Sequence, residues 1–110
     1  MNGDESEYVT VIIKPFRLEA VMNALKPFHS EALSVSQVRG YGRQKGHLEL
    51  YRGAEYVISF IPKLRLEFAI PSAEAPEAME AVRQAARTGR IGDGKIFVQR
   101  IYLTGGDEAV

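Results

Sequence analysis

The chain of 110 residues has no cysteine and no tryptophan, and it has only two histidines, His29 and His47. Without cysteine it cannot form a disulfide, use a thiolate nucleophile or bind zinc through sulfur. Two histidines are too few for a histidine-based metal site unless carboxylates help, so we expect no bound metal. A net charge is also lacking, because 14 basic residues balance 14 acidic ones. This balance argues against a protein that coats nucleic acid, and it mildly favours an oligomer.

Long hydrophobic runs are absent as well, so the sequence predicts no membrane-spanning helix. The first residues include Asp4, Glu5 and Glu7 and do not form the apolar segment of a secretion signal. We therefore expect a cytoplasmic protein. A length of 110 residues with 45% hydrophobic residues is typical of one globular domain, which we place over residues 1–110.

The hydrophobic pattern predicts four strands. Residues 8–14 are β-branched and mostly apolar, which is typical of a strand that is buried on both faces. A second strand is expected over residues 33–39 and a last one over residues 95–103. Between them, the hydrophobic pattern returns at Tyr56 and becomes a strict alternation, in which Leu64, Leu66, Phe68 and Ile70 are opposed by Arg65 and Glu67; this indicates a half-buried strand.

Two amphipathic helices are expected between these strands. The first is ended by Pro27, and its inward positions are Leu18, Val21, Met22 and Leu25. The second begins near Pro76, and its inward positions are Ala75, Met79, Val82 and Ala86, with Gly89 placed to cap its end. The resulting βαββαβ order predicts an α+β, ferredoxin-like fold, an antiparallel sheet with both helices on one face. This fold hosts many functions and decides none.

A long segment without hydrophobic pattern, residues 40–55, separates the second and third strands. Loops of this length are uncommon in compact domains and are usually functional or mobile. One interpretation is a solvated ribbon whose charges favour solubility. The other is a partner-binding arm in which Tyr51 and Arg52 provide anchors.

The same region also partly resembles an RNA-binding motif. Residues 39–42 match the first half of the RNP1 motif of RNA-recognition domains. Residues 43–46 then stand where the stacking aromatic residues are needed, and none of them is aromatic. We therefore expect no nucleic acid among the partners.

A second glycine-rich segment covers residues 88–95 with the sequence TGRIGDGK. It is not a P-loop, because Ile96 follows Lys95 where a P-loop has serine or threonine. A helix cap followed by an Asp-Gly turn would account for the glycines without a ligand. Closely spaced backbone amides beside Arg90 and Lys95 could also bind an anion.

No grouping of residues indicates catalysis. The sequence lacks a supported Ser/His/Asp arrangement, and its acidic residues are too scattered to identify a general acid and base. Arg17 is the one candidate for an early anion-binding loop, and it is more typical of a solvated helix start. We therefore expect a protein that is not an enzyme.

Both unusual segments resemble one family, the PII signal-transduction proteins. Residues 39–56 are similar to the T-loop of that family, and YRGAEY at 51–56 matches its signature hexapeptide. Residues 88–101 are similar to the second signature, which contains the B-loop at about 88–95. Residues 12–16 and 60–63 also resemble the family, and the similarity extends over residues 8–98.

The resemblance implies a homotrimer of ferredoxin-like subunits with an adenine-nucleotide site in each cleft between subunits. The T-loop, here about residues 40–56, would regulate a membrane transporter or a metabolic enzyme. By position, the nucleotide-binding residues would be Ile12, Ser34, Gly40, Arg43, Gln44, Thr88, Gly92, Asp93, Gly94 and Lys95. Gln44 and Lys63 correspond to residues that bind 2-oxoglutarate together with Mg-ATP. Tyr56 stands where many bacterial members are nucleotidylated.

The C-terminal region departs from the family pattern. About five residues that usually follow the GDGKIFV run are missing, and one alignment keeps a single phosphate-binding arginine, Arg100, whereas the other keeps none. One charge-assisted contact contributes roughly 1.5–3 kcal/mol, which is about ten- to hundredfold in affinity. We therefore expect ADP or AMP to be favoured over ATP, and the 2-oxoglutarate site to be weakened.

Three functions follow from the resemblance. The first is a PII-like protein of inorganic-carbon metabolism that senses adenylates and bicarbonate, as in carboxysome contexts. The second is a conventional nitrogen-regulatory PII protein that senses ATP and 2-oxoglutarate. The third is a trimeric scaffold that binds no nucleotide, although the glycine-rich segment at 92–95 argues against it.

Overall fold

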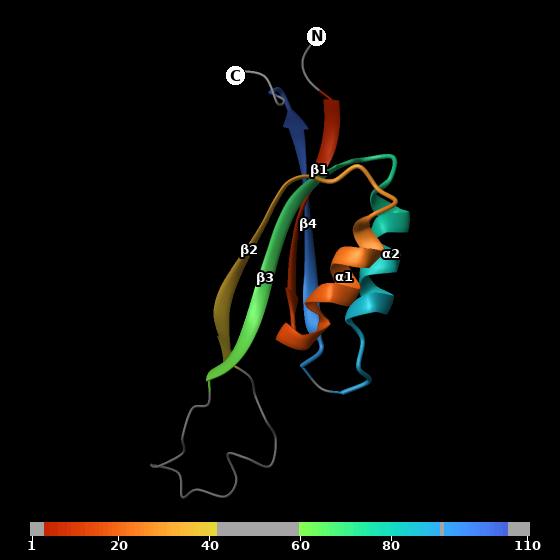
Figure 1. Ribbon diagram of the computed structural model, residues 1–110. Coiled ribbons are helices and arrows are strands. Elements are labelled where there is room, and N and C mark those ends of the chain that lie inside the picture. The colour runs from red at the N-terminus through yellow and green to blue at the C-terminus, as the bar shows by residue number, and fades with distance from the viewer. Residues whose placement is uncertain (1–3, 42–59, 91, 106–110) are drawn as a thin grey trace, which may run out of the picture.

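A four-stranded antiparallel sheet with two helices forms the fold, and the expected βαββαβ order is confirmed (Figure 1). The computed structural model describes residues 4–41, 60–90 and 92–105. The strand order in the sheet is β2-β3-β1-β4. The elements are β1 (Asp4–Ile13), the 3-10 turn η1 (Pro15–Arg17), α1 (Leu18–Leu25), β2 (Glu31–Tyr41), β3 (Phe60–Pro71), α2 (Ala75–Ala86) and β4 (Gly94–Leu103).

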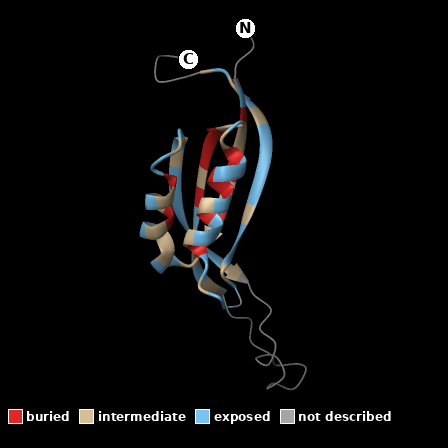
Figure 2. Cartoon of the chain, turned by 90° about the vertical axis from the view of Figure 1, so that its right-hand side faces the viewer, coloured by how far each residue is buried: buried red, intermediate tan, exposed pale blue. Residues whose placement is uncertain are grey.

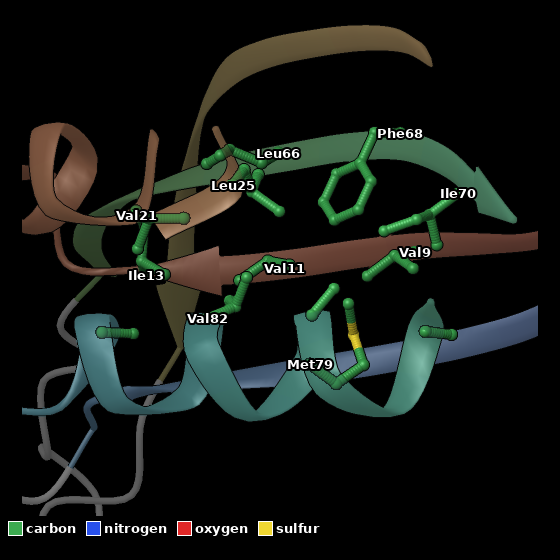
Figure 3. Close-up of a cluster of buried hydrophobic side chains, with 13 residues drawn as sticks. Val9, Val11, Ile13, Val21, Leu25, Leu66, Phe68, Ile70, Met79 and Val82 are labelled. Carbon is green, nitrogen blue, oxygen red and sulfur yellow. The ribbon is translucent and has the colours of Figure 1, made fainter. Parts of the chain in front are cut away.

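Both helices lie on the same face of the sheet, and the core fills the space between them and the central strands (Figures 1 and 3). On β3 the predicted alternation is confirmed, because Leu66, Phe68 and Ile70 are buried while Arg65 is exposed. The inward positions of α2 are buried as predicted, and Ala78 joins them. Figure 2 shows that the edge strand β2 is largely exposed by comparison.

The prediction that the first strand is buried on both faces is wrong for the single chain. Val9, Val11 and Ile13 are fully buried under the helices, whereas the alternate residues Tyr8 and Thr10 are partly exposed. The reason is that the described chain covers only one face of the sheet. The uncovered side, called here the open face, is given by the strand registers as Tyr8, Thr10, Ile12, Ser34, Ser36, Lys63, Arg65, Glu67, Ala69, Lys95, Phe97 and Gln99.

Two strands are longer than predicted, whereas β4 ends at Leu103 as expected. β1 begins at Asp4 because its first residues pair with the end of β4, Asp4 opposite Leu103, and β2 covers Glu31–Tyr41 instead of 33–39. β2 contains an irregularity between Glu31 and Ser34, where Ala32 has a φ of 56°. The third strand begins at Phe60, and Tyr56 lies outside the described residues.

The end of α2 differs from the expected glycine cap. The helix ends at Ala86 with Arg87 as its C-cap in an extended conformation, so Gly89 lies two residues beyond the cap and does not form it. The side chain of Arg17 instead binds this end of the helix. Its guanidinium donates from Nε and Nη2 to the Ala85 carbonyl at 2.9 and 2.6 Å, which satisfies a carbonyl of the last turn. Arg17 is thus engaged in helix capping rather than in an anion-binding loop.

Of the helices in the described ranges, none has the length and apolar character needed to cross a membrane.

Candidate functional site

Two segments that are distant in sequence meet at one end of the sheet. The connection from α2 to β4 lies at the same end as the last residues of β2 and the first residues of β3 (Figure 1). Lys63 on β3 donates its ammonium to the Gly92 carbonyl and so joins the two segments. Gly40 is next to this lysine, because a Cβ built at Gly40 would be in ordinary contact, at 3.4 Å, with Cγ of Lys63. The structure therefore brings together three predicted residues, Gly40, Lys63 and Gly92.

Asp93 closes the connection into a tight loop. Its Oδ2 accepts the backbone N–H groups of Thr88 at 2.8 Å and Gly89 at 2.9 Å. Its Oδ1 accepts the Thr88 hydroxyl and the Lys14 ammonium, the latter at 3.1 Å. The hydrogen bonds from the Thr88 hydroxyl and amide, and then those from Lys14 and Gly89, hold the pKa of Asp93 far below its usual range. Asp93 is therefore ionised at neutral pH, and its carboxylate shapes the loop from within.

Gly94 fixes how closely the loop approaches β1. Its φ is 147°, and a Cβ at this position would lie 2.0 Å from the Ile12 carbonyl oxygen. Only glycine allows this contact, because any side chain would overlap the backbone of β1. The next residue, Lys95, is consequently held opposite Ile12, so that two predicted nucleotide-binding residues are neighbours on adjacent strands.

The surroundings of the loop are positively charged. Lys14 lies within 3.2 Å of Thr88 Oγ1 as well as beside Asp93. Burial, and next the charge of Lys14, lower the pKa of Lys63, and the carboxylate of Asp93 partly opposes this effect. An anion near these two lysines would relieve their mutual repulsion. Lys14 has no assigned role in the sequence prediction, although its place directly after a buried strand was a signal that it lies at the end of the sheet.

A cavity of about 310 Å³ opens beside the loop, between α2 and the start of β4. Arg83 of α2 and Arg87, its C-cap residue, line it, and neither is among the site residues predicted from the sequence. In the sequence, arginines at these positions look the same as those of a solvated helix face, so no pattern marks them as cavity residues. The complete lining is Val11, Ile12, Arg83, Ala86, Arg87, Asp93, Gly94, Lys95 and Ile96.

Two predicted residues lie apart from this loop in the single chain. Ser34 is exposed on the edge strand β2, opposite Glu67, with β3 and β1 between it and Lys95. Arg100 lies farther along β4, where its guanidinium is 3.1 Å from Glu5 Oε2 and 3.7 Å from Glu7 Oε2. The remaining predicted residues, Arg43, Gln44 and Tyr56, lie outside the described residues.

Comparison with known proteins gives consistent matches. The family model described as nitrogen regulatory protein P-II matches residues 6–104. The nitrogen regulatory protein P-II of Rhodospirillum rubrum is 54% identical over 93 residues, which are 84% of this chain and 83% of that protein. The nitrogen regulatory protein GlnK of Escherichia coli K12 has the same identity and coverage. The P-II protein of Rhizobium meliloti is 50% identical over the same shares of both chains.

Proposed function

Because the chain belongs to the nitrogen regulatory P-II family, we propose that it is a cytoplasmic signalling protein, not an enzyme, that binds adenine nucleotides. In this proposal the segment at about 40–56 regulates a membrane transporter or a metabolic enzyme. The nucleotide state of the protein sets whether that partner is bound.

The observation that supports nucleotide binding most strongly is the construction of the loop at 88–95. The carboxylate of Asp93 binds groups within the loop, and Gly94 allows the loop to lie close to β1. Three ammonium groups surround the loop with positive charge, those of Lys14, Lys63 and Lys95. Backbone amides of glycine-rich turns, combined with flexible ammonium groups, are well suited to phosphate. A loop that only connected a helix to a strand would need none of these cations.

A homotrimer is the assembly we propose. The open face is a sheet surface that the described chain leaves uncovered, and it contains Phe97 with 56% of its surface exposed. Burial of this aromatic side chain against further copies of the chain would favour association. Further support comes from Ser34, which lies away from the loop in one chain and so would need a second copy to complete a shared site.

The comparisons favour the nitrogen-regulatory alternative over the inorganic-carbon interpretation. The relatives reported above have nitrogen-regulatory names, and none has a name related to carboxysomes or bicarbonate. We therefore propose nitrogen signalling, with ATP and 2-oxoglutarate as effectors. A bicarbonate effect and modification of Tyr56 stay predictions.

One observation supports the predicted preference for ADP or AMP over ATP. Arg100 is paired with Glu5 and Glu7, and β4 runs without interruption from Gly94 to Leu103. Arg100 lies opposite Glu7 on β4, beyond the residues next to the loop, so in the single chain it is not placed where a distal phosphate on the loop would lie. The preference for ADP or AMP thus remains compatible with a nitrogen-regulatory role.

Calorimetric titration with AMP, ADP and ATP tests the proposal. Each nucleotide is added with and without Mg²⁺ plus 2-oxoglutarate, and with and without bicarbonate. We expect binding of ADP, weaker binding of ATP, and an increase in ATP affinity on addition of 2-oxoglutarate. A bicarbonate effect without a 2-oxoglutarate effect would support the inorganic-carbon function instead. Absence of heat with all three nucleotides would leave the trimeric scaffold.

A further inference from the structure

We propose that Arg83 of α2 and Arg87, its C-cap residue, bind the terminal phosphate of a nucleoside diphosphate and thereby set the preference of the site for diphosphate over monophosphate. This inference rests on the proposed nucleotide-binding function and adds two residues to its site. Both residues line the cavity between α2 and β4, next to the glycine-rich loop.

The two arginines are placed to act together. Arg83 is in the last turn of α2 and Arg87 is the C-cap residue four positions later, so the two lie about one turn apart at the end of the helix. Both line the cavity of about 310 Å³, which also reaches Gly94 and Lys95 of the loop. A phosphate chain that begins on the loop amides can therefore continue into a space lined by these two arginines.

The charges in this cavity favour an anion. The cationic residues of its lining are Arg83, Arg87 and Lys95, of which Lys95 belongs by register to the open face, and Asp93 is the one acidic residue in the lining. The carboxylate of Asp93 is already engaged by Lys14, Thr88 and Gly89, so it neutralises little of the charge of the arginines. The excess positive charge faces a cavity wall that is otherwise apolar, formed by Val11 and Ile96 among others.

Both guanidinium groups are available to a ligand. Arg83 pairs with Glu80 three residues earlier on α2, and each side chain is 56% exposed, so the pair contributes little and is easily exchanged. Arg87 makes no ion pair within the part of the chain that the structure describes. Arginine is suited to this role because its planar fork can bind two phosphate oxygens at once.

The position of Arg100 indicates which phosphate Arg83 and Arg87 would bind. Arg100 lies apart from the loop in the single chain, beside Glu5 and Glu7. Arg83 and Arg87 would supply guanidinium groups from the end of α2 in its place. We therefore expect them to act on the β-phosphate and to have little effect on a nucleoside monophosphate.

The test is calorimetric titration of the full chain with ADP, AMP and inorganic pyrophosphate. The variants are R83Q, R87Q, the double variant R83Q/R87Q, and the conservative double variant R83K/R87K. Lys26→Gln is the matched control, because it removes the same charge from an exposed position at the end of α1. Thermal unfolding of each variant shows whether the fold is retained.

The expected result is that R83Q/R87Q binds ADP at least tenfold more weakly, while AMP affinity changes less than threefold and the K26Q control matches the wild type. The R83K/R87K variant should recover part of the ADP affinity. An unchanged ADP affinity, or equal losses for ADP and AMP, would overturn the inference and leave the nucleotide-binding proposal intact.

A wild-type protein that binds no nucleotide would instead refute the proposed function. In that case, pyrophosphate binding that is lost in R83Q/R87Q would still support an arginine-dependent phosphate site. Absence of pyrophosphate binding by the wild type would overturn the inference as well.

Discussion

Replacement of Gly94 by alanine is expected to lower the free energy of unfolding by about 3 kcal/mol, which is at the upper end of the range for single substitutions. The added Cβ would lie 2.0 Å from the Ile12 carbonyl oxygen, and the φ of 147° is strained for any residue with a side chain. β4 would have to move away from β1 at its first residue. Because Lys95 follows directly, ADP binding should be lost as well.

Urea denaturation measures the stability change, and Gly89→Ala is the matched control. Gly89 also has a positive φ, 83°, but a Cβ there meets nothing within 4 Å. Its replacement should cost only the left-handed backbone penalty of about 1–2 kcal/mol. Equal losses for the two variants would show that the close approach to Ile12 does not determine the position of the loop.

Phe97→Glu is expected to convert the proposed trimer into monomers. Phe97 lies opposite Thr10 on the open face, where a charge would be buried without a partner when three copies associate. In a single chain the side chain is already 56% exposed, so the substitution should leave the subunit fold intact. The mass in solution, measured by light scattering after size-exclusion chromatography, should fall to that of one chain.

Tyr102→Glu is the control for this experiment. Tyr102 is on the same strand and is 62% exposed, but its register partner is Glu5, which places it on the opposite face of the sheet from Phe97. This variant should remain trimeric. Dissociation of both variants, or of neither, would contradict an assembly through the open face.

The sequence predicts the fold well where only one side of a strand or helix is buried. Leu66, Phe68 and Ile70 alternate with charged residues because one side of β3 faces the helices, and this period is visible in the sequence. β1 was harder to predict, since its β-branched run is compatible with burial on both faces. The sequence does not show whether its second face, with Tyr8 and Thr10, is covered within one chain or by other copies.

The candidate site was predictable only in part, for a different reason. The glycine-rich segment is visible as a run of letters, but its partner Lys14 is 74 residues away from Thr88 and is brought to it only by the fold. The local spacing of Gly89 favours the role of a helix cap. In the structure its amide binds Asp93, a contact within the loop that propensity does not predict.

Titration of the wild type and of Lys95→Gln with ADP tests most directly whether the loop at 88–95 binds phosphate. We predict that the wild type binds ADP and that the variant binds it at least tenfold more weakly, as expected for loss of one charge-assisted contact of about 1.5–3 kcal/mol. The Lys26→Gln variant should bind like the wild type. No ADP binding by the wild type, or equal affinity of Lys95→Gln, would contradict the proposed role of this loop.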